Sequence, residues 1–112
     1  MTPVEIVQRQ LDAYNAHDLA GFVAMYAQDI KVYRMPNTEP ALSGIVQFAE
    51  YYGTKRFNVP ELHAELLGRL ATGNKVVDHE RIVGISDKVV EAIAVYQVGP
   101  EKIEAVWFHA PE

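Results

Sequence analysis

Apolar residues recur at helical spacing in the first half of the chain and at strand spacing in the second half. The segment Thr2-Pro3-Val4-Glu5 is typical of a helix start, because its threonine can cap the helix and its glutamate can complete a capping box. The apolar stripe of this helix consists of Val4, Val7, Leu11 and Tyr14. We therefore predict a first helix with one buried side, on which Tyr14 is either a core residue or a polar tip that reaches a cavity.

Two further helices and a short strand are predicted before residue 60. Asp18 is a suitable cap for the second helix, whose apolar stripe consists of Leu19, Phe22, Val23 and Tyr26. A short strand over residues 30–35 and a turn-rich connection over 36–40 precede the third helix, which starts at Ser43-Gly44 and ends near residue 57. Arg34, at the end of this strand, is interpreted either as a rim charge or as a cationic anchor for a ligand oxyanion.

The pattern changes to strands from Leu62 onward. Turn-rich links of about three residues separate the strands, and such short links predict antiparallel neighbours. The four predicted strands cover residues 62–70, 75–85, 89–98 and 102–110. Helices followed by strands predict an α+β fold, in which N-terminal helices pack on a curved, mostly antiparallel sheet.

The predicted strand over residues 89–98 is apolar on both of its faces. One face carries Val89, Ile93 and Val95, and the other carries Val90, Ala92, Ala94, Tyr96 and Val98. Because the three predicted helices can cover only one face of the sheet, the other face needs a different cover. We expect a homodimer that forms through this face with isologous symmetry.

Composition and charge narrow the classes of function. The length of 112 residues predicts one domain spanning residues 1–112. A net charge of −5 without a Lys/Arg-rich stripe argues against nucleic acid or an anionic membrane as a partner. No apolar run approaches the roughly 18 residues that span a bilayer. The N-terminus lacks the features of a signal peptide, so a cytoplasmic location is expected. The absence of cysteine excludes disulfides and thiolate chemistry.

Four consecutive ionisable residues, Asp78-His79-Glu80-Arg81, interrupt the apolar strand predicted over residues 75–85. A strand alternates its side chains, so Asp78 and Glu80 share one face while His79 and Arg81 share the other. Charges inside a sheet are costly unless they are paired, solvated or lining a site. We therefore predict that one pair faces a cavity and the other a subunit interface, with the register deciding which.

The residues of four segments carry a resemblance to a known superfamily. They are Leu11-Asp12-Ala13-Tyr14-Asn15-Ala16-His17-Asp18-Leu19-Ala20-Gly21-Phe22, Met25-Tyr26-Ala27-Gln28-Asp29, Ser43-Gly44 and Lys102-Ile103-Glu104-Ala105-Val106-Trp107-Phe108. Over nearly its whole length, the chain resembles the nuclear transport factor 2-like superfamily, which includes ketosteroid isomerases and SnoaL-like polyketide cyclases. The resemblance implies a cystatin-like fold, a cone-shaped pocket between the helices and the concave sheet face, and dimerisation through the convex face. It implies little about activity, because this fold hosts unrelated functions.

The catalytic set of ketosteroid isomerases is absent at the corresponding positions. The aspartate base of that family falls on Arg34 or Tyr33, the tyrosine oxyanion donor on Gln10, and the protonated aspartic acid near Ala94. Steroid isomerisation by that mechanism is therefore not expected.

The superfamily template nevertheless implies which residues line a pocket. Tyr26 and Tyr52 match aromatic positions that support the pocket in the family, and His79 and Arg81 fall on the concave face. The other residues placed on that face are Val77, Val83, Ala92, Ala94, Tyr96, Val106 and Phe108. The opposite face then carries Asp78, Glu80, Trp107 and His109. A β-bulge would exchange these two sets, so that Asp78 or Glu80 enters the pocket as a general base and Trp107 becomes a ligand-stacking wall.

The resulting prediction is a protein that binds a small apolar ligand and is either an enzyme or a binding module. As an enzyme it would be a cofactor-free isomerase, cyclase or dehydratase, with His79 as the acid/base and Tyr14 and Arg34 as polarising groups. The alternative is a non-catalytic ligand-binding or dimerisation module, in which His79 makes a structural hydrogen bond. The histidines are scattered and no phosphate loop is present, so no metal or cofactor is expected.

Overall fold

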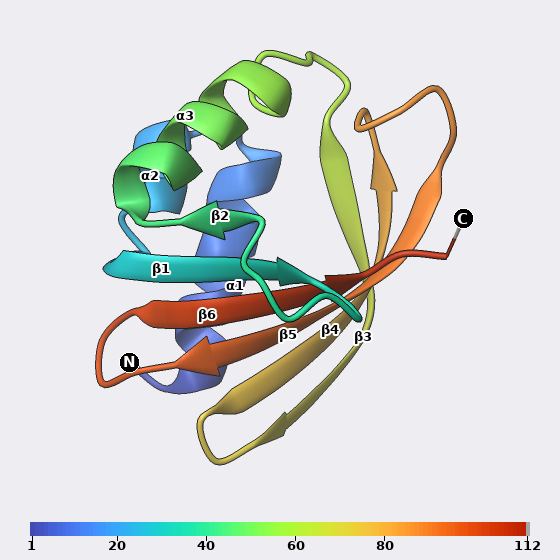
Figure 1. Ribbon diagram of the computed structural model, residues 1–112. Helices are drawn as coiled ribbons and strands as arrows, with labels where there is room; N and C mark the ends of the chain where they lie inside the picture. Colours follow the sequence, from blue (N-terminus) through green and yellow to red (C-terminus); the bar gives the residue numbers. More distant parts are fainter. Residues whose placement is uncertain (112) are drawn as a thin grey trace.

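Three helices pack against a six-stranded sheet in the computed structural model, which describes residues 1–111 (Figure 1). The helices are α1 (Pro3–Asn15), α2 (Leu19–Val23) and α3 (Ile45–Lys55). The strands are β1 (Tyr26–Arg34), β2 (Leu42–Ser43), β3 (His63–Thr72), β4 (Lys75–Val83), β5 (Val90–Val98) and β6 (Ile103–His109). Their order in the sheet is β2-β1-β6-β5-β4-β3. The predicted α+β fold, with N-terminal helices on a curved sheet, is confirmed.

Helix α1 begins at the predicted capping box. The Glu5 N–H group donates to Thr2 Oγ1 over 3.2 Å, and the Thr2 N–H group donates to Glu5 Oε1 over 2.8 Å. The buried stripe starts later than predicted, because Val4 lies in the exposed first turn. The residues of the stripe are Ile6, Val7, Gln10, Leu11 and Tyr14. Two polar groups, those of Gln10 and Tyr14, therefore face the sheet.

Strand β1 begins earlier than the sequence pattern predicts. Tyr26 was expected at the end of the second helix, but α2 ends at Val23 and Tyr26 is the first residue of β1. Strand β1 pairs with β6 in parallel, with Tyr26 opposite Ile103 and Lys31 opposite Ala105. Hydrogen bonding to this distant strand overrides the local helical spacing, which is why the pattern along the chain misplaced the boundary.

Strands β3 to β6 form the predicted antiparallel meander. The pairing of β3 with β4 contains a β-bulge, because Leu66 lies opposite Glu80 whereas Gly68 lies opposite His79. The extra residue changes which side chains of β3 face inward. As a result Arg69 lies opposite Asp78, on the helix side of the sheet.

The inner face of β4 carries Val76, Asp78, Glu80 and Ile82, all of them buried. The predicted placement of His79 and Arg81 on this face is therefore wrong. Residues directly opposite each other in an antiparallel pair share a face, and Glu80 lies opposite Ala92 of β5. Because Ala92 faces inward, as predicted, so does Glu80.

The core between the sheet and the helices is rich in aromatic rings. Phe22 of α2 lies at its centre, and its ring packs at centroid distances of 4.9–5.7 Å against five others. These neighbours are Tyr14, Tyr26, Phe48, Tyr52 and Phe57. Three of the five are tyrosines, so this core also brings hydroxyl groups to the helix side of the sheet. Within residues 1–111, no helix is long and apolar enough to cross a membrane.

Candidate functional site: a cavity with a buried glutamate

A cavity of about 100 Å³ lies between the helices and the inner face of the sheet. Pockets for drug-sized ligands measure about 300–1,000 Å³, so this space matches a smaller molecule. Its polar lining residues are Gln10, Tyr14, Tyr26, Arg34, Tyr51, Tyr52, Arg56, Glu80 and Tyr96. Apolar residues, among them Phe22, Ile82, Ala92 and Phe108, complete the wall. The cavity is therefore mostly apolar, with a few convergent polar groups.

Glu80 is the only acidic residue among those that line the cavity, within the part of the chain described. The residue as a whole is 4% exposed. Burial, and after it the negative charge of Asp78, raise the pKa of the Glu80 carboxyl group to about 7, while Arg69 opposes this rise. At neutral pH the group is thus divided between its acid and its base forms, as a general acid/base requires.

The oxygen atoms of Glu80 reach the open space of the cavity. No hydrogen bond joins the Glu80 side chain to another residue of the 1–111 region, although every fully buried side-chain nitrogen or oxygen there has a partner. The Glu80 carboxyl oxygens are therefore not fully enclosed by protein. They are available to a molecule inside the cavity.

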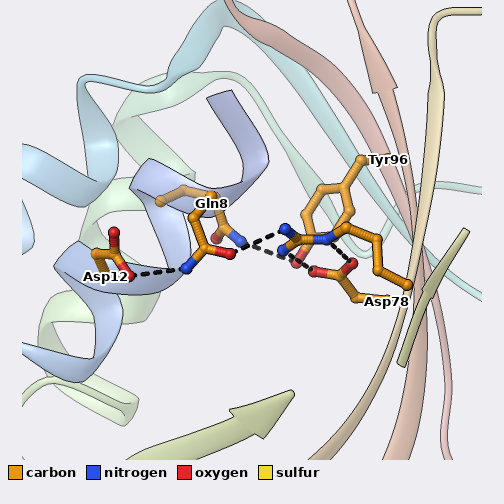
Figure 2. A network of polar contacts seen from close by, with 6 residues as sticks. Gln8, Asp12, Asp78 and Tyr96 are labelled. Atoms are coloured by element: carbon orange, nitrogen blue, oxygen red, sulfur yellow. Dashed lines mark hydrogen bonds and ion pairs between the residues drawn. The ribbon is translucent and has the colours of Figure 1, made fainter. Parts of the chain in front are cut away.

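Asp78, next to Glu80 on the inner face of β4, is the buried end of a polar network that reaches the surface at Asp12 (Figure 2). Arg69 donates to both Asp78 oxygens, over 2.6 Å from Nε and 2.9 Å from Nη2. Arg69 Nη1 also donates to Gln8 Oε1 over 2.8 Å, and Gln8 Nε2 donates to Asp12 Oδ1 over 2.8 Å. This bidentate pair leaves Asp78 with a structural role and separates it from the cavity chemistry.

Gln10 of α1 links two phenol groups across the cavity wall. The Tyr26 hydroxyl donates to Gln10 Oε1 over 2.7 Å, and Gln10 Nε2 donates to the Tyr96 hydroxyl over 3.2 Å. Burial raises the pKa of both tyrosines well above the usual value for a phenol. Both phenols therefore stay protonated. The Tyr96 hydroxyl accepts the hydrogen bond from Gln10, so its own O–H group can donate to another acceptor.

Tyr14 and Tyr52 present hydroxyl groups that have no hydrogen-bond partner within residues 1–111. Both side chains are less than 10% exposed and both line the cavity. Burial, more than any nearby charge, raises the pKa of each phenol. These groups are protonated donors, and a developing negative charge on a bound molecule is what such donors stabilise.

The mouth of the cavity carries two arginines. Arg34 is the last residue of β1, and Arg56 follows the last residue of α3. Arg56 Nη2 donates to the Tyr51 hydroxyl oxygen over 2.8 Å, and Arg34 Nη2 donates to the same oxygen over 3.3 Å. Two guanidinium groups from elements that are far apart in the sequence thus converge on one atom, the Tyr51 hydroxyl oxygen.

The structure brings together six of the nine residues predicted for the site. Tyr14, Arg34, Tyr26, Tyr52, Tyr96 and Phe108 all line the cavity. The catalytic roles predicted for Tyr14 and Arg34 stay predictions.

The three other predicted site residues, His79, Arg81 and Trp107, lie on the outer face of the sheet. His79 Nε2 lies 2.9 Å from Glu91 Oε2, and Arg81 Nη1 lies 3.2 Å from Glu65 Oε1. The Trp107 ring stacks on Tyr33, with ring centroids 5.4 Å apart. The placement of His79 and Arg81 in the pocket was wrong because the even-numbered residues of β4 face inward. Trp107 lies on the outer face, as the superfamily template implied, so the alternative in which it forms a pocket wall was wrong. His79 therefore cannot act on a molecule in this cavity.

The sequence did contain a signal that Glu80 faces the pocket, although Glu80 was given this place only in the alternative with exchanged faces. Three residues, an odd number, link the predicted strands 75–85 and 89–98, so a direct hairpin places the even-numbered residues of both strands on one face. The structure has this parity, with Ile82 opposite Val90. Ala92 was already predicted to face inward, so Glu80 follows from it by parity. The bulge that was considered as the cause lies in β3 instead, where Gly68 inside a strand is a usual sign of one. Arg56, just beyond a helix end, has no comparable signal.

No group of three or more His, Asp or Glu side chains in the described part of the chain is arranged to hold a metal ion. The polar residues around the cavity are phenols, one amide, one carboxyl group and two guanidinium groups. These groups suit hydrogen bonding, proton transfer and charge stabilisation in a bound organic molecule.

Known proteins share this fold over almost the full chain. An uncharacterised cystatin-fold protein from Novosphingobium aromaticivorans has a TM-score of 0.87 at 21% identity, and the match covers 96% of this chain and 97% of that one. A SnoaL-like protein of unknown function from Burkholderia thailandensis has a TM-score of 0.81 at 24% identity, covering 98% and 94%. A proposed ketosteroid isomerase from Kribbella flavida has a TM-score of 0.81 at 16% identity, covering 96% and 76%.

These structural similarities establish the fold, and the sequence establishes the family. No curated protein is a significant match to the sequence. Residues 7–107 match the family described as the SnoaL-like domain. This range includes all the residues named above as lining the cavity except Phe108. The chain therefore belongs to the SnoaL-like domain family, as its resemblance to the nuclear transport factor 2-like superfamily implied.

Proposed function

We propose that this protein catalyses proton transfer in a small, largely apolar carbonyl compound, with Glu80 as the general acid/base. The observation that supports the proposal most directly is the carboxyl group of Glu80, a residue that is 4% exposed. This group has a pKa of about 7 and faces a cavity without a hydrogen-bond partner among residues 1–111. A carboxyl group in such surroundings is what proton abstraction next to a carbonyl group needs at neutral pH.

The proposed reaction moves one proton out and back. The Glu80 carboxylate removes a proton from the carbon next to the carbonyl group, and the electron pair of that C–H bond moves toward the carbonyl oxygen. The Tyr14 and Tyr52 hydroxyl groups donate hydrogen bonds to the resulting oxyanion. Protonated Glu80 then returns the proton to a different atom, which gives an isomer, or to a leaving hydroxyl group, which gives a dehydrated product.

A Glu80→Gln variant tests this proposal. A suitable probe is 2-indanone in deuterated water, in which exchange of the protons next to the carbonyl group is followed by NMR. The native protein should accelerate the exchange, and the variant should lose at least about 100-fold of this acceleration, because general acid–base catalysis contributes about 10²–10⁴-fold.

A matched control is His79→Gln, which removes an ionisable group from the outer face of the same strand and should retain the exchange rate. Equal rates in the native protein and in Glu80→Gln would contradict the proposal. Binding of the probe without any acceleration would instead favour the non-catalytic binding module.

We also propose that two copies of the chain associate through the outer face of the sheet. Four apolar side chains form a row across this face through direct cross-strand pairing: Tyr33 opposite Trp107, Trp107 opposite Val95, and Val95 opposite Val77. Four of the charged residues near this row are paired within the chain, as His79–Glu91 and Arg81–Glu65. This pairing lets two copies approach despite a net charge of −5 each.

A further inference from the structure

The two arginines at the cavity mouth are positioned by different parts of the fold. Arg34 stands at the end of β1, where its opposite residue on β6 is Phe108, a cavity-lining residue. Arg56 is held by three contacts. It donates to the Tyr51 hydroxyl over 2.8 Å and to the Lys55 carbonyl over 3.0 Å, and its guanidinium carbon lies 5.2 Å from the centre of the Tyr51 ring. These contacts orient Arg56, and they use only some of the five N–H donors of a guanidinium group.

Neither of these arginines has an acidic partner among residues 1–111. The ion pairs in this region are Arg69–Asp78, His79–Glu91 and Arg81–Glu65. The chain has 15 acidic residues against 10 basic ones, so carboxylates are the more abundant charge. The two positive charges that share one phenol oxygen repel each other, and an anion between them would offset this repulsion. The mouth therefore has the charge and the donors of an anion-recognition site that residues 1–111 do not fill.

The interior beyond the mouth limits the kind of anion. The wall is formed mainly by aromatic rings and small apolar side chains, and the volume is about 100 Å³. The one carboxyl group inside, that of Glu80, disfavours a second negative charge in the ligand. The arrangement thus suits a molecule with one anionic end, which stays at the mouth, and an uncharged body that enters the cavity.

We infer that the site takes a small monocarboxylic acid, with its carboxylate between Arg34 and Arg56 and its apolar body directed toward Glu80. A guanidinium group matches a carboxylate in shape and can donate two parallel hydrogen bonds to it. The inference rests on the proposed function, because it names the ligand class of the same site. In the proposed reaction, the carboxylate would hold the molecule so that its reacting carbon lies near Glu80.

NMR titration of the isotope-labelled protein tests the inference with phenylacetate and its neutral analogues phenylacetamide and 2-phenylethanol. Saturable shifts of the backbone amides of Ala64 and Ala92, which line the cavity, would report binding inside it. Phenylacetate should bind at least about tenfold more tightly than either neutral analogue, which corresponds to about 1.4 kcal/mol. The Arg34→Gln/Arg56→Gln double variant should lose this preference.

The matched control is Arg81→Gln, which removes an arginine of the outer sheet face and should keep the preference for phenylacetate. Equal affinity for phenylacetate and 2-phenylethanol would overturn the inference, and so would an unchanged preference in the double variant. Acetate that binds as tightly as phenylacetate would also overturn it, because the cavity would then not take the apolar body.

Failure of this test can be distinguished from failure of the proposed function. The exchange of protons in 2-indanone uses a neutral probe and depends on Glu80, whereas the preference for a carboxylate depends on the arginines. A protein that catalyses the exchange but does not prefer phenylacetate would keep the proposed function and lose this inference.

Discussion

Glu80 and Asp78 are two acidic residues on the same face of the same strand, yet the structure gives them different surroundings. Arg69 binds both oxygens of Asp78, whereas Glu80 faces the cavity without such a partner. Arg69 therefore compensates the charge of Asp78 directly. Glu80 experiences burial and the residual repulsion from Asp78, and both raise its pKa. Two identical chemical groups thus acquire a structural role and a candidate catalytic role.

We predict that Asp78→Asn lowers the pKa of Glu80 below about 7. The substitution removes the negative charge that raises this pKa, and it also leaves the positive charge of Arg69 without its partner, so both effects favour ionised Glu80. The pH titration of the Glu80 side-chain carboxyl carbon, followed by NMR in both proteins, measures the change.

Glu91→Gln serves as the control for this titration, because Glu91 pairs with His79 on the outer face. It should leave the titration of Glu80 nearly unchanged. A higher pKa in Asp78→Asn than in the native protein would show that the charge of Asp78 does not set the ionisation of Glu80. Breaking a buried ion pair costs about 3–5 kcal/mol. The backbone amide spectrum of Asp78→Asn is therefore compared with that of the native protein, to check that the variant is folded.

At the level of the elements, local sequence was a good guide to where helices and strands lie. The capping box at Thr2 and the four strands of the meander follow from side-chain chemistry and from alternation within short segments. Pairing between distant segments was less predictable. The parallel contact of β1 with β6 moved the boundary at Tyr26, and the bulge after Leu66 reoriented Arg69.

The first helix is joined to the sheet by Asn15, and this contact supports a prediction. Asn15 Nδ2 donates to the Ala64 carbonyl over 2.9 Å, and the Ala64 N–H group donates to Asn15 Oδ1 over 2.8 Å. Asn15→Ala leaves both backbone groups of a buried cavity-lining residue without partners. We expect a loss of unfolding free energy of about 1–3 kcal/mol, measured by urea denaturation.

Gln8→Ala is a comparison variant on the same helix, because it also removes a side chain that joins α1 to β3, through Arg69. It should cost less than Asn15→Ala, since Arg69 keeps its two bonds to Asp78. Equal stability of Asn15→Ala and the native protein would mean that water replaces both bonds without cost.

For the molecule as a whole, the candidate site depends on groups that no single segment of sequence connects. Arg34, Tyr51 and Arg56 meet at the mouth from β1, from α3 and from the residue after α3. The arginine at position 34 was noticed because it ends a predicted strand. Its partner at position 56 could be recognised only after the helix and the strand were placed in space, because nothing in the local pattern indicates their proximity.

The proposed association through the outer sheet face is tested by Ile93→Lys. Ile93 is 39% exposed on the outer face of β5, so a lysine there can remain solvated in the monomer and folding should persist. At the interface between two copies the same charge would be buried and costly. Sedimentation velocity should show a dimer for the native protein and a monomer for the variant at micromolar concentration.

Val46→Lys is the control for this experiment, because Val46 is 78% exposed on α3, away from the outer face of the sheet. It should sediment as the native protein does. A native protein that is monomeric at these concentrations, or a variant Ile93→Lys that remains dimeric, would contradict association through this face.

The bulge in β3 also determines how substitutions in this strand should be tolerated. Before the bulge the even-numbered Ala64 and Leu66 lie opposite inward residues of β4, and after it the odd-numbered Arg69 takes such a position. Leu70, which follows, is 74% exposed. Related sequences that diverge under selection for the same fold should therefore vary at odd positions in the first half of β3 and at even positions in the second. A relative that lacks one residue here would have to find another inward partner for its counterpart of Asp78.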